Sequence, residues 1–347
     1  MNWAIDLAER RKLPDVVVRA GMRQLIGQRL RTERVRAGTA PQNSQRGFVE
    51  AMRAEPIAVA TDAANAQHYE LPAEFFKTIL GPYLKYSSCV WPDGVTDLAA
   101  AEARMLALSC ERAGIADGME VLDLGCGWGS LSLWVAQRCP GARVLSVSNS
   151  RSQAEFVRGR CEELGLENVD VITADMNDFA TDRRFDRVVS IEMFEHMRNW
   201  ERLFGRVGGW LRRGGRFFLH VFCHRKLAYL YTDKGSSDWM ARNFFTGGIM
   251  PSEELPHHFT SHLEVEKQWR VNGLHYSRTL EAWLESMDAN RDRLMALFRS
   301  TFGDDAERSF ARWRLFFMAC SELFRFRGGG EWFVSHTLMR PHALPDR

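Results

Sequence analysis

Two carboxylates and an imidazole stand close together in the segment 191–197. Glu192, Glu195 and His196 follow an apolar run, and in a helical turn the spacings i, i+3 and i+4 would place them on one face. Burying such a cluster costs free energy, so its presence indicates a functional role. These side chains could orient an amine substrate or accept its proton. The competing interpretation is that Glu195 and His196 only hold the loop while Glu192 faces solvent.

The turn at 123–129, which reads DLGCGWG, is the second group of residues that could bind a reacting molecule. Asp123 ends a short apolar run, and Gly125 and Gly127 stand where a helix should begin. Glycine there permits positive φ and the close approach of a ligand. A dinucleotide site would space its glycines G-x-G-x-x-G, whereas the third glycine here comes one residue early. The D-x-G-x-G form is typical of turns that bind S-adenosylmethionine, and a tight turn without a ligand is the alternative.

Further polar residues follow the next two apolar runs. Ser148 or Asn149 could make hydrogen bonds to the ribose of such a ligand, and Gln153 could reach the same place from the first turn of a helix. Asp175 could accept a hydrogen bond from the adenine amino group, or it could be an ordinary N-cap or turn aspartate. The sequence leaves these two roles of Asp175 open.

Short apolar runs alternate with amphipathic segments between residues 97 and 224, and these elements must position the two sites. Strands are expected at 121–124, 143–147, 169–172, 185–191 and 216–221, and helices at 97–113, 131–139, 153–164 and 200–211. The alternation predicts an α/β fold with a doubly wound, mostly parallel, Rossmann-like sheet. Right-handed crossovers place the loops after the strands at one edge, where ligands bind. A last strand at 331–339 would complete the sheet.

The flanking regions follow other patterns. Residues 1–37 are expected to be helical, 38–47 to form a loop and 48–57 to form a second helix. The stretch 225–262 is irregular and rich in aromatic residues, and it is interpreted as an insertion or cap. Two more helices are expected at 278–297 and 304–324.

Aromatic residues of the cap and the C-terminal region are candidates for a substrate pocket. They are Trp239, Phe244, Phe245, Phe324, Phe326 and Trp332. A flat aromatic amine would stack there, and its cation would gain cation–π attraction of roughly 0.5–2 kcal/mol. Each residue taken singly is better explained as part of the core, so only the cluster indicates a pocket.

Composition and charge exclude several classes of function. A net charge of +2 over 347 residues gives no strong positive potential that would attract nucleic acid. The Asn/Asp-Pro-Pro-aromatic motif of RNA or DNA adenine N-methyltransferases is also absent. Arginines at 29, 31, 34 and 36 are interpreted as a solvated helix face, with an anionic lipid surface as the alternative. Seven cysteines without a CxxC pair, and the lack of a signal peptide or a membrane-spanning run, favour a cytoplasmic protein without a metal site.

Together these motifs resemble the cyclopropane-fatty-acid-synthase-like methyltransferases, and within them the coclaurine N-methyltransferase branch. The segments that carry the resemblance are 13–15 with 28–30, 68–72, 86–89, 121–129, 148–153, 192–197, 275–279 and 331–332. The resemblance implies an N-terminal helical lid region at 1–96, an S-adenosylmethionine-binding core at 97–224, a substrate-binding cap at 225–300 and a C-terminal helix and strand at 301–347. It implies a small amine, aromatic or alkaloid-like, as the substrate. The oligomeric state stays open, with a homodimer as one possibility.

The same resemblance assigns roles to single residues. Tyr86 and Ser87 would reach the cofactor from the N-terminal side, and Gly125 and Gly127 would line its methionine end. Ser148, Asn149 and Gln153 would hold the ribose, and Asp175 with Met176 would hold the adenine. Glu192, Glu195 and His196 match the active-site cluster of the N-methyltransferases residue by residue.

The lipid-cyclopropanating branch of this family differs at positions that bear on the chemistry. It has cysteine where this chain has Ser88, glycine where it has Glu192 and tyrosine where it has Phe316. In that branch the cysteine and the tyrosine help to hold a bicarbonate that removes a proton, so their loss and the gain of a carboxylate favour amine methylation. His220 favours the opposite, because it matches a histidine of the lipid branch. An enzyme that methylates unsaturated acyl chains at a membrane surface is therefore the alternative, and a non-catalytic cofactor-binding scaffold is the third hypothesis.

Overall fold

The computed structural model describes residues 2–40, 44–59, 71–232 and 238–342. A seven-stranded sheet forms its centre, in the order β3-β2-β1-β4-β5-β9-β8. Strands β1 to β5 pair in parallel, and β9 pairs antiparallel with both β5 and β8. The strands are β1 (Glu120–Leu124), β2 (Arg143–Ser148), β3 (Val169–Thr173), β4 (Phe185–Ile191), β5 (Leu211–His224), β8 (Leu263–Val271) and β9 (Trp332–Pro341). This is the doubly wound, Rossmann-like sheet that the sequence predicts.

Helices cover both faces of the sheet, because successive side chains of a strand point to opposite faces. Val121 of β1 shares a core cluster with Leu106 of α6 (Leu98–Ala113) and Leu131 of α7 (Ser130–Arg138). Its neighbour Leu122 shares a different cluster with Trp200 and Leu203 of α9. The helices around the sheet are α3 (Gln45–Ala54), α6 (Leu98–Ala113), α7 (Ser130–Arg138), α8 (Arg151–Leu164) and α9 (Trp200–Trp210). The expected helices and strands of the region 97–224 are thereby confirmed, with ends that shift by a few residues.

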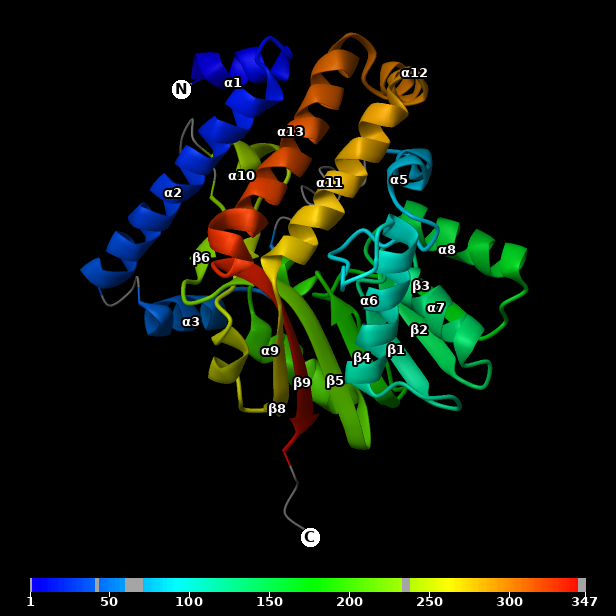
Figure 1. Cartoon of the computed structure of the whole chain (residues 1–347). Helices are drawn as coiled ribbons and strands as arrows, with labels where there is room; N and C mark the ends of the chain where they lie inside the picture. The colour runs from blue at the N-terminus through cyan, green and yellow to red at the C-terminus, as the bar shows by residue number, and fades with distance from the viewer. Residues whose placement is uncertain (1, 41–43, 60–70, 233–237, 343–347) are drawn as a thin grey trace.

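A second layer of helices lies beyond the carboxyl ends of the parallel strands. In this layer α13 (Ala306–Arg325) lies between α2 (Asp15–Thr39) and α11 (Gly273–Ala289) (Figure 1). The members of the layer are α1 (Asn2–Glu9), α2 (Asp15–Thr39), α5 (Ala73–Ile79), α10 (Trp239–Asn243), α11 (Gly273–Ala289), α12 (Arg291–Phe302) and α13 (Ala306–Arg325). Ion pairs fasten α2 to this layer: Arg314 pairs with Asp15, and Arg19 and Arg23 pair with the fully buried Glu322. The long N-terminal helix is therefore fixed onto the C-terminal part of the chain.

The structure corrects four expectations. The helix expected at 278–297 is two helices, α11 and α12, which meet at Asn290. The loop expected at 38–47 is shorter, because α2 continues to Thr39 and α3 begins at Gln45, after the N-cap Ser44. Strand β8 was not expected at all. A small two-stranded sheet, β6 (Tyr229–Leu230) with β7 (Ile249–Met250), gives the region 225–262 more regular structure than expected.

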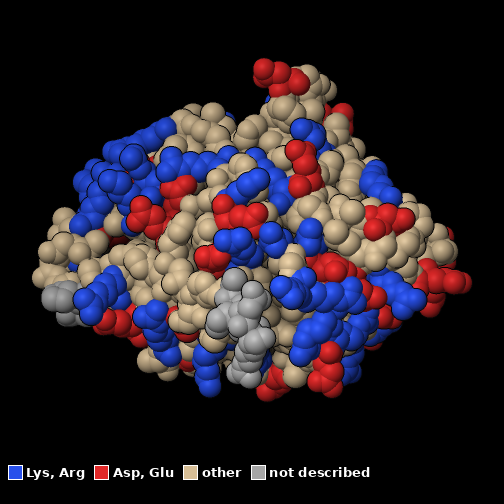
Figure 2. Space-filling view, turned by 90° about the horizontal axis from the view of Figure 1, so that it is seen from below, with Lys and Arg blue, Asp and Glu red and all other residues tan. Residues whose placement is uncertain are grey.

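The surface carries both signs of charge. On the face seen from below, basic side chains gather in places, and acidic side chains lie among them (Figure 2). In the described part of the chain, no helix is both long enough and apolar enough to cross a bilayer.

Candidate active site

A cavity of about 990 Å³ lies where β1 and β4 end. The turn after β1 contributes Gly125 and Gly127 to its wall, and the segment after β4 contributes Glu192 and His196. Helices α2, α11 and α13 close it from the second layer. The volume is at the upper end of the range for ligand pockets, so it has room for a cofactor together with a substrate.

The glycine-rich turn takes the backbone conformation that the sequence indicated. Gly125, Gly127 and Gly129 all have positive φ, of 79°, 54° and 79°. A β-carbon on Gly125 would lie 2.8 Å from the side chain of Met193, whereas one on Gly127 would meet nothing within 4 Å. Gly125 is therefore needed for the approach of the turn to the segment after β4, and Gly127 leaves space beside the cavity.

The groups along this turn fit S-adenosylmethionine. Within the described chain, Trp128 Nε1 and Ser130 Oγ are buried and have no hydrogen-bond partner, and both residues border the cavity. Buried polar groups are normally paired, so these two indicate a polar ligand at the turn. Tyr86, Ser87 and Asp123 border the same space.

Of the residues expected to hold the ribose and the adenine, only Gln153 borders the cavity that the described residues form. Gln153 borders the cavity, and its amide oxygen accepts a hydrogen bond of 2.8 Å from Ser148 Oγ. Ser148, Asn149, Asp175 and Met176 are not part of the wall that the described residues form. Asp175 Oδ1 accepts a hydrogen bond from the backbone of residue 177, which is the turn role that the sequence left open.

Asp123 is buried at the start of the turn. The hydroxyl of Ser132 donates a hydrogen bond of 2.7 Å to Asp123 Oδ2, and Ser146 donates in turn to Ser132. Burial raises the pKa of Asp123 to about 6, although the bond from Ser132 acts to lower it. A neutral Asp123 is therefore favoured in mildly acidic solution.

The replacement of Asp123 by Asn should make the free energy of unfolding depend less on pH. The folded protein holds the proton of Asp123 up to a pKa of about 6, whereas the unfolded chain releases it near 3.8. The stability that this proton gives is present at low pH and is lost as the pH rises from about 4 to about 6, by about 3 kcal/mol. Urea unfolding of both proteins at a series of pH values measures the difference, and parallel curves would contradict the prediction.

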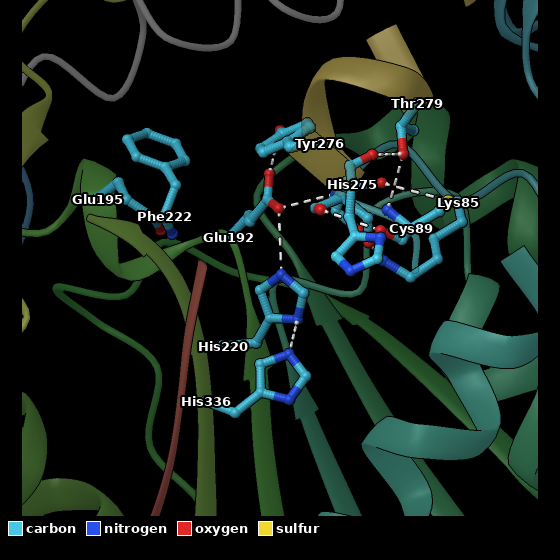
Figure 3. Close-up of polar contacts among 12 residues, drawn as sticks. Lys85, Cys89, Glu192, Glu195, His220, Phe222, His275, Tyr276, Thr279 and His336 are labelled. Atoms are coloured by element: carbon cyan, nitrogen blue, oxygen red, sulfur yellow. Dashed lines mark hydrogen bonds and ion pairs between the residues drawn. The ribbon is translucent and has the colours of Figure 1, made fainter. Parts of the chain in front are cut away.

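Glu192 is the most constrained carboxylate of the site. Its φ is +50°, a conformation that is uncommon for a residue with a side chain and that often marks functional sites. Its Oε1 accepts from the backbone N–H of Ser88 at 2.8 Å and lies 3.1 Å from His220 Nε2. Its Oε2 accepts from the hydroxyl of Tyr276 at 2.5 Å (Figure 3). Burial raises the pKa of Glu192, while the charge of Lys85 and these donors act to lower it.

Glu195 and His196 do not share a helical face with Glu192, so that expectation is wrong. A 3₁₀ turn spans only Phe194–His196, and the positive φ of Glu192 places that residue before it. His196 borders the cavity, and its ring centroid lies 4.8 Å from that of Phe245. Glu195 is fully buried and is not part of the described cavity wall.

The carboxyl group of Glu195 is tied to strand β5. Its Oε1 accepts a hydrogen bond of 2.7 Å from the backbone N–H of Phe222, and its Oε2 has no partner among the described residues. Burial, followed by the nearby charge of Glu192, raises the pKa of Glu195 well above its usual value. Burial therefore favours the neutral form of Glu195, which lies outside the described cavity wall.

A network of hydrogen bonds positions the loop that donates to Glu192. The buried Lys85 Nζ donates to Ser87 Oγ and to the backbone oxygen of Ser88. The next residue, Cys89, donates its backbone N–H to Thr279 Oγ1 on α11 at 3.1 Å. The motif at 275–279 thus fastens the loop at 85–91 beside Glu192, and Lys85 and Tyr276 are residues of the cavity that sequence analysis missed.

Aromatic side chains line much of the cavity. Of the expected pocket residues, Trp239, Phe245, Phe324 and Trp332 are in its wall, and Phe244 and Phe326 are not in the wall that the described residues form. Phe244 instead stacks on Phe316, with ring centroids 4.4 Å apart, and Phe316 reaches the cavity. Further aromatic wall residues, which the sequence did not single out, are Phe222, Tyr229, Tyr231, Tyr276 and Trp283.

No group of three His, Cys, Asp or Glu side chains that could hold a metal ion occurs among the described residues. Of the segment 68–72, which carries part of the family resemblance, His68, Tyr69 and Glu70 lie outside the described part of the chain.

Comparison with known proteins agrees with this geometry. A family model for mycolic acid cyclopropane synthetases matches residues 59–329. The (S)-coclaurine N-methyltransferase of Thalictrum flavum subsp. glaucum is 37% identical over 298 residues, which are 84% of this chain and 82% of that protein. The cyclopropane-fatty-acyl-phospholipid synthase of Escherichia coli (strain K12) is 31% identical over 271 residues, which are 77% of this chain and 66% of that protein.

A solved structure is similar over almost the whole chain. It is a crystal structure of coclaurine N-methyltransferase bound to N-methylheliamine and SAH, with a TM-score of 0.92 and 34% sequence identity. The match covers 97% of this chain and 98% of that one. The protein therefore belongs to the mycolic acid cyclopropane synthetase family and is an S-adenosylmethionine-dependent methyltransferase.

Proposed function

We propose that this enzyme N-methylates a small aromatic amine of the alkaloid type. The observation that carries the proposal is the carboxylate of Glu192, which borders an aromatic cavity next to the glycine-rich turn. A carboxylate with a network of fixed donors can orient an ammonium ion and accept its proton. The names of the relatives, among them pavine N-methyltransferase of Thalictrum flavum subsp. glaucum at 34% identity, support the same substrate class.

The cofactor, when bound, supplies a methyl group on a positively charged sulfur. Tyr86, Ser87, Asp123 and Gln153 border the part of the cavity near the turn and are the residues that we assign to cofactor binding, together with Gly125 and Gly127. We retain Ser148 and Asn149 as residues proposed to bind the ribose, and Asp175 with Met176 as residues proposed to bind the adenine.

Two groups share the work at the amine in this proposal, the carboxylate of Glu192 and the imidazole of His196. Glu192 attracts and orients the ammonium form of the substrate, and it or His196 takes up the proton that the amine must lose before methylation. Glu195, as a neutral acid on the backbone of Phe222, holds the segment in place from beneath. The aromatic walls exclude water and attract the cation, which keeps the nitrogen close to the reacting carbon.

A direct assay tests the proposed class of substrate. The purified enzyme is incubated with methyl-labelled cofactor and either coclaurine and pavine or vesicles of phospholipids with unsaturated acyl chains. Label is expected in the amines, with a rate at least about tenfold above that in the vesicles. Label in the lipid extract instead would favour the cyclopropane-type activity, and the absence of transfer to both would contradict both activities.

A further inference from the structure

A line of polar side chains runs from the cavity into the sheet, between β5 and β9 (Figure 3). His220 Nε2 lies 3.1 Å from Glu192 Oε1, and His336 Nε2 lies 3.0 Å from His220 Nδ1. Arg112, in the last turn of α6, lies with Nη1 2.8 Å from His336 Nδ1. Both imidazoles are fully buried, and of this line only Glu192 belongs to the described cavity wall.

The chemistry of arginine fixes the direction of this line. A guanidinium group only donates hydrogen bonds, so His336 Nδ1 must be the acceptor. The proton of His336 is then on Nε2 and is donated to His220 Nδ1. His220 in turn carries its proton on Nε2 and donates it to Glu192. All three bonds thus point toward the carboxylate.

The two imidazoles are neutral in this arrangement. Burial lowers the pKa of His220 and of His336 well below the usual value, and the nearby charges of Lys85 and Arg112 lower both further. A neutral imidazole has one donor and one acceptor, which is what each position in the line requires. A protonated Glu192 Oε1 would have to direct its hydrogen at an N–H of His220, so the line favours the carboxylate form.

We propose that Arg112, His336 and His220 form a one-directional hydrogen-bond chain that holds Glu192 as an ionised acceptor, which makes Arg112 and His336 positioning residues for the reaction. The inference rests on the proposed function, in which Glu192 meets the amine. The direction of these hydrogen bonds also excludes them as a path for the proton that the amine releases. Outward transfer would require both imidazoles to reverse their tautomers while Arg112 still donates to His336.

Other groups face Glu192 and set how large the effect can be. Lys85 and the loop N–H of Ser88 favour the anion, as does the hydroxyl of Tyr276 on α11. The charge of Glu192 acts on two further neighbours: it raises the pKa of Glu195 and that of the Cys320 thiol on α13, so both are favoured in their neutral forms beside it. His196 borders the same cavity. Loss of the chain should therefore shift the ionisation of Glu192 without abolishing it.

Arginine 112 offers a test away from the cavity. In Arg112→Met, His336 Nδ1 loses its cationic donor and both imidazoles can reverse, whereas Arg112→Lys retains a charged donor. Arg187→Met is the matched control, because Arg187 is also half-buried near the end of α6 but donates to the backbone oxygens of residues 113, 114 and 186. The measurement is the pH dependence of kcat/KM for amine methylation.

The acidic limb of the profile should move to higher pH by about one unit in Arg112→Met, and the rate should recover at alkaline pH. Arg112→Lys should restore the wild-type profile, and Arg187→Met should leave the limb in place. A loss in Arg112→Met by one constant factor at every pH, or an unchanged limb, would overturn the proposal, because a purely structural residue would behave in this way.

A second readout does not need turnover. Imidazole ¹⁵N spectra of the full-length enzyme, assigned with His336→Gln and His220→Gln, should show both histidines as neutral Nε2–H tautomers in the wild type and in Arg112→Lys. In Arg112→Met the signals should shift toward the Nδ1–H form. If these spectra appear but no amine is methylated, the proposed function is wrong, whereas the hydrogen-bond chain is still supported. Nδ1–H tautomers in the wild type would contradict the hydrogen-bond chain itself.

Discussion

The replacement of Glu192 by Gln is expected to lower kcat for amine methylation by about 10²-fold or more. Glutamine has nearly the same size, so the cavity keeps its shape, and its oxygen can still accept from one of the donors around it. The negative charge that attracts the ammonium ion, and the ability to take its proton, are lost. Because we assign cofactor binding mainly to the turn after β1, the affinity for the cofactor should change by less than about threefold.

Two measurements separate these effects. Calorimetry gives the Kd of the cofactor, and steady-state rates at saturating cofactor give kcat. Glu264→Gln serves as the control, since Glu264 is a carboxylate of the edge strand β8 that pairs with Arg340, and β4, β5 and β9 separate β8 from β1. A variant of Glu192 that loses cofactor affinity and turnover in equal measure would contradict the role assigned to this carboxylate.

The core of the fold could be predicted because its signals are local. Apolar runs such as 121–124 and 185–191 alternate with amphipathic segments, and right-handed crossovers then bring their ends to one edge. This is why the turn at Gly125 and the cluster at Glu192 could be expected at a common site from the order of the elements alone.

The parts that were missed depend on long-range contacts. Strand β8 carries Glu264 and Lys267 and lies at the edge of the sheet, where charged side chains are usual and periodicity is weak. The apolar spacing of α11 continues into α12, so the break at Asn290 leaves no clear gap in the pattern. The pairing of β5 with β9 places His336 opposite His220 across 116 positions of sequence, which no local pattern reveals.

The geometry around Glu192 could be predicted only in part. The residue types Glu192, Glu195 and His196 indicate acid–base chemistry, but the positive φ of Glu192 has no sequence signature and removes it from the helical turn. Similarly, the motif at 275–279 contains Tyr276, yet its bond to Glu192 joins α11 to the end of β4 and becomes visible only in the folded chain.

The second large effect is expected at Gly125. Gly125→Val should weaken cofactor binding by more than about 100-fold, because φ of +79° is strained for a β-branched side chain and its β-carbon would lie 2.8 Å from Met193. The turn can relieve this contact only by moving away from the segment after β4. That movement would displace Trp128 and Ser130, whose unpaired polar atoms border the cavity.

Gly118→Val is the matched control for this prediction. Gly118, in the turn before β1, also has positive φ, of 78°, but a β-carbon there would meet nothing within 4 Å, and the residue is not part of the described cavity wall. This variant should therefore carry only the backbone strain, about 1–2 kcal/mol, and retain cofactor affinity within about tenfold. Calorimetric titration with the cofactor, after thermal unfolding has shown that both variants fold, gives the comparison. Equal affinities in Gly125→Val and the wild type would mean that the close approach of the turn to Met193 does not shape the cofactor site.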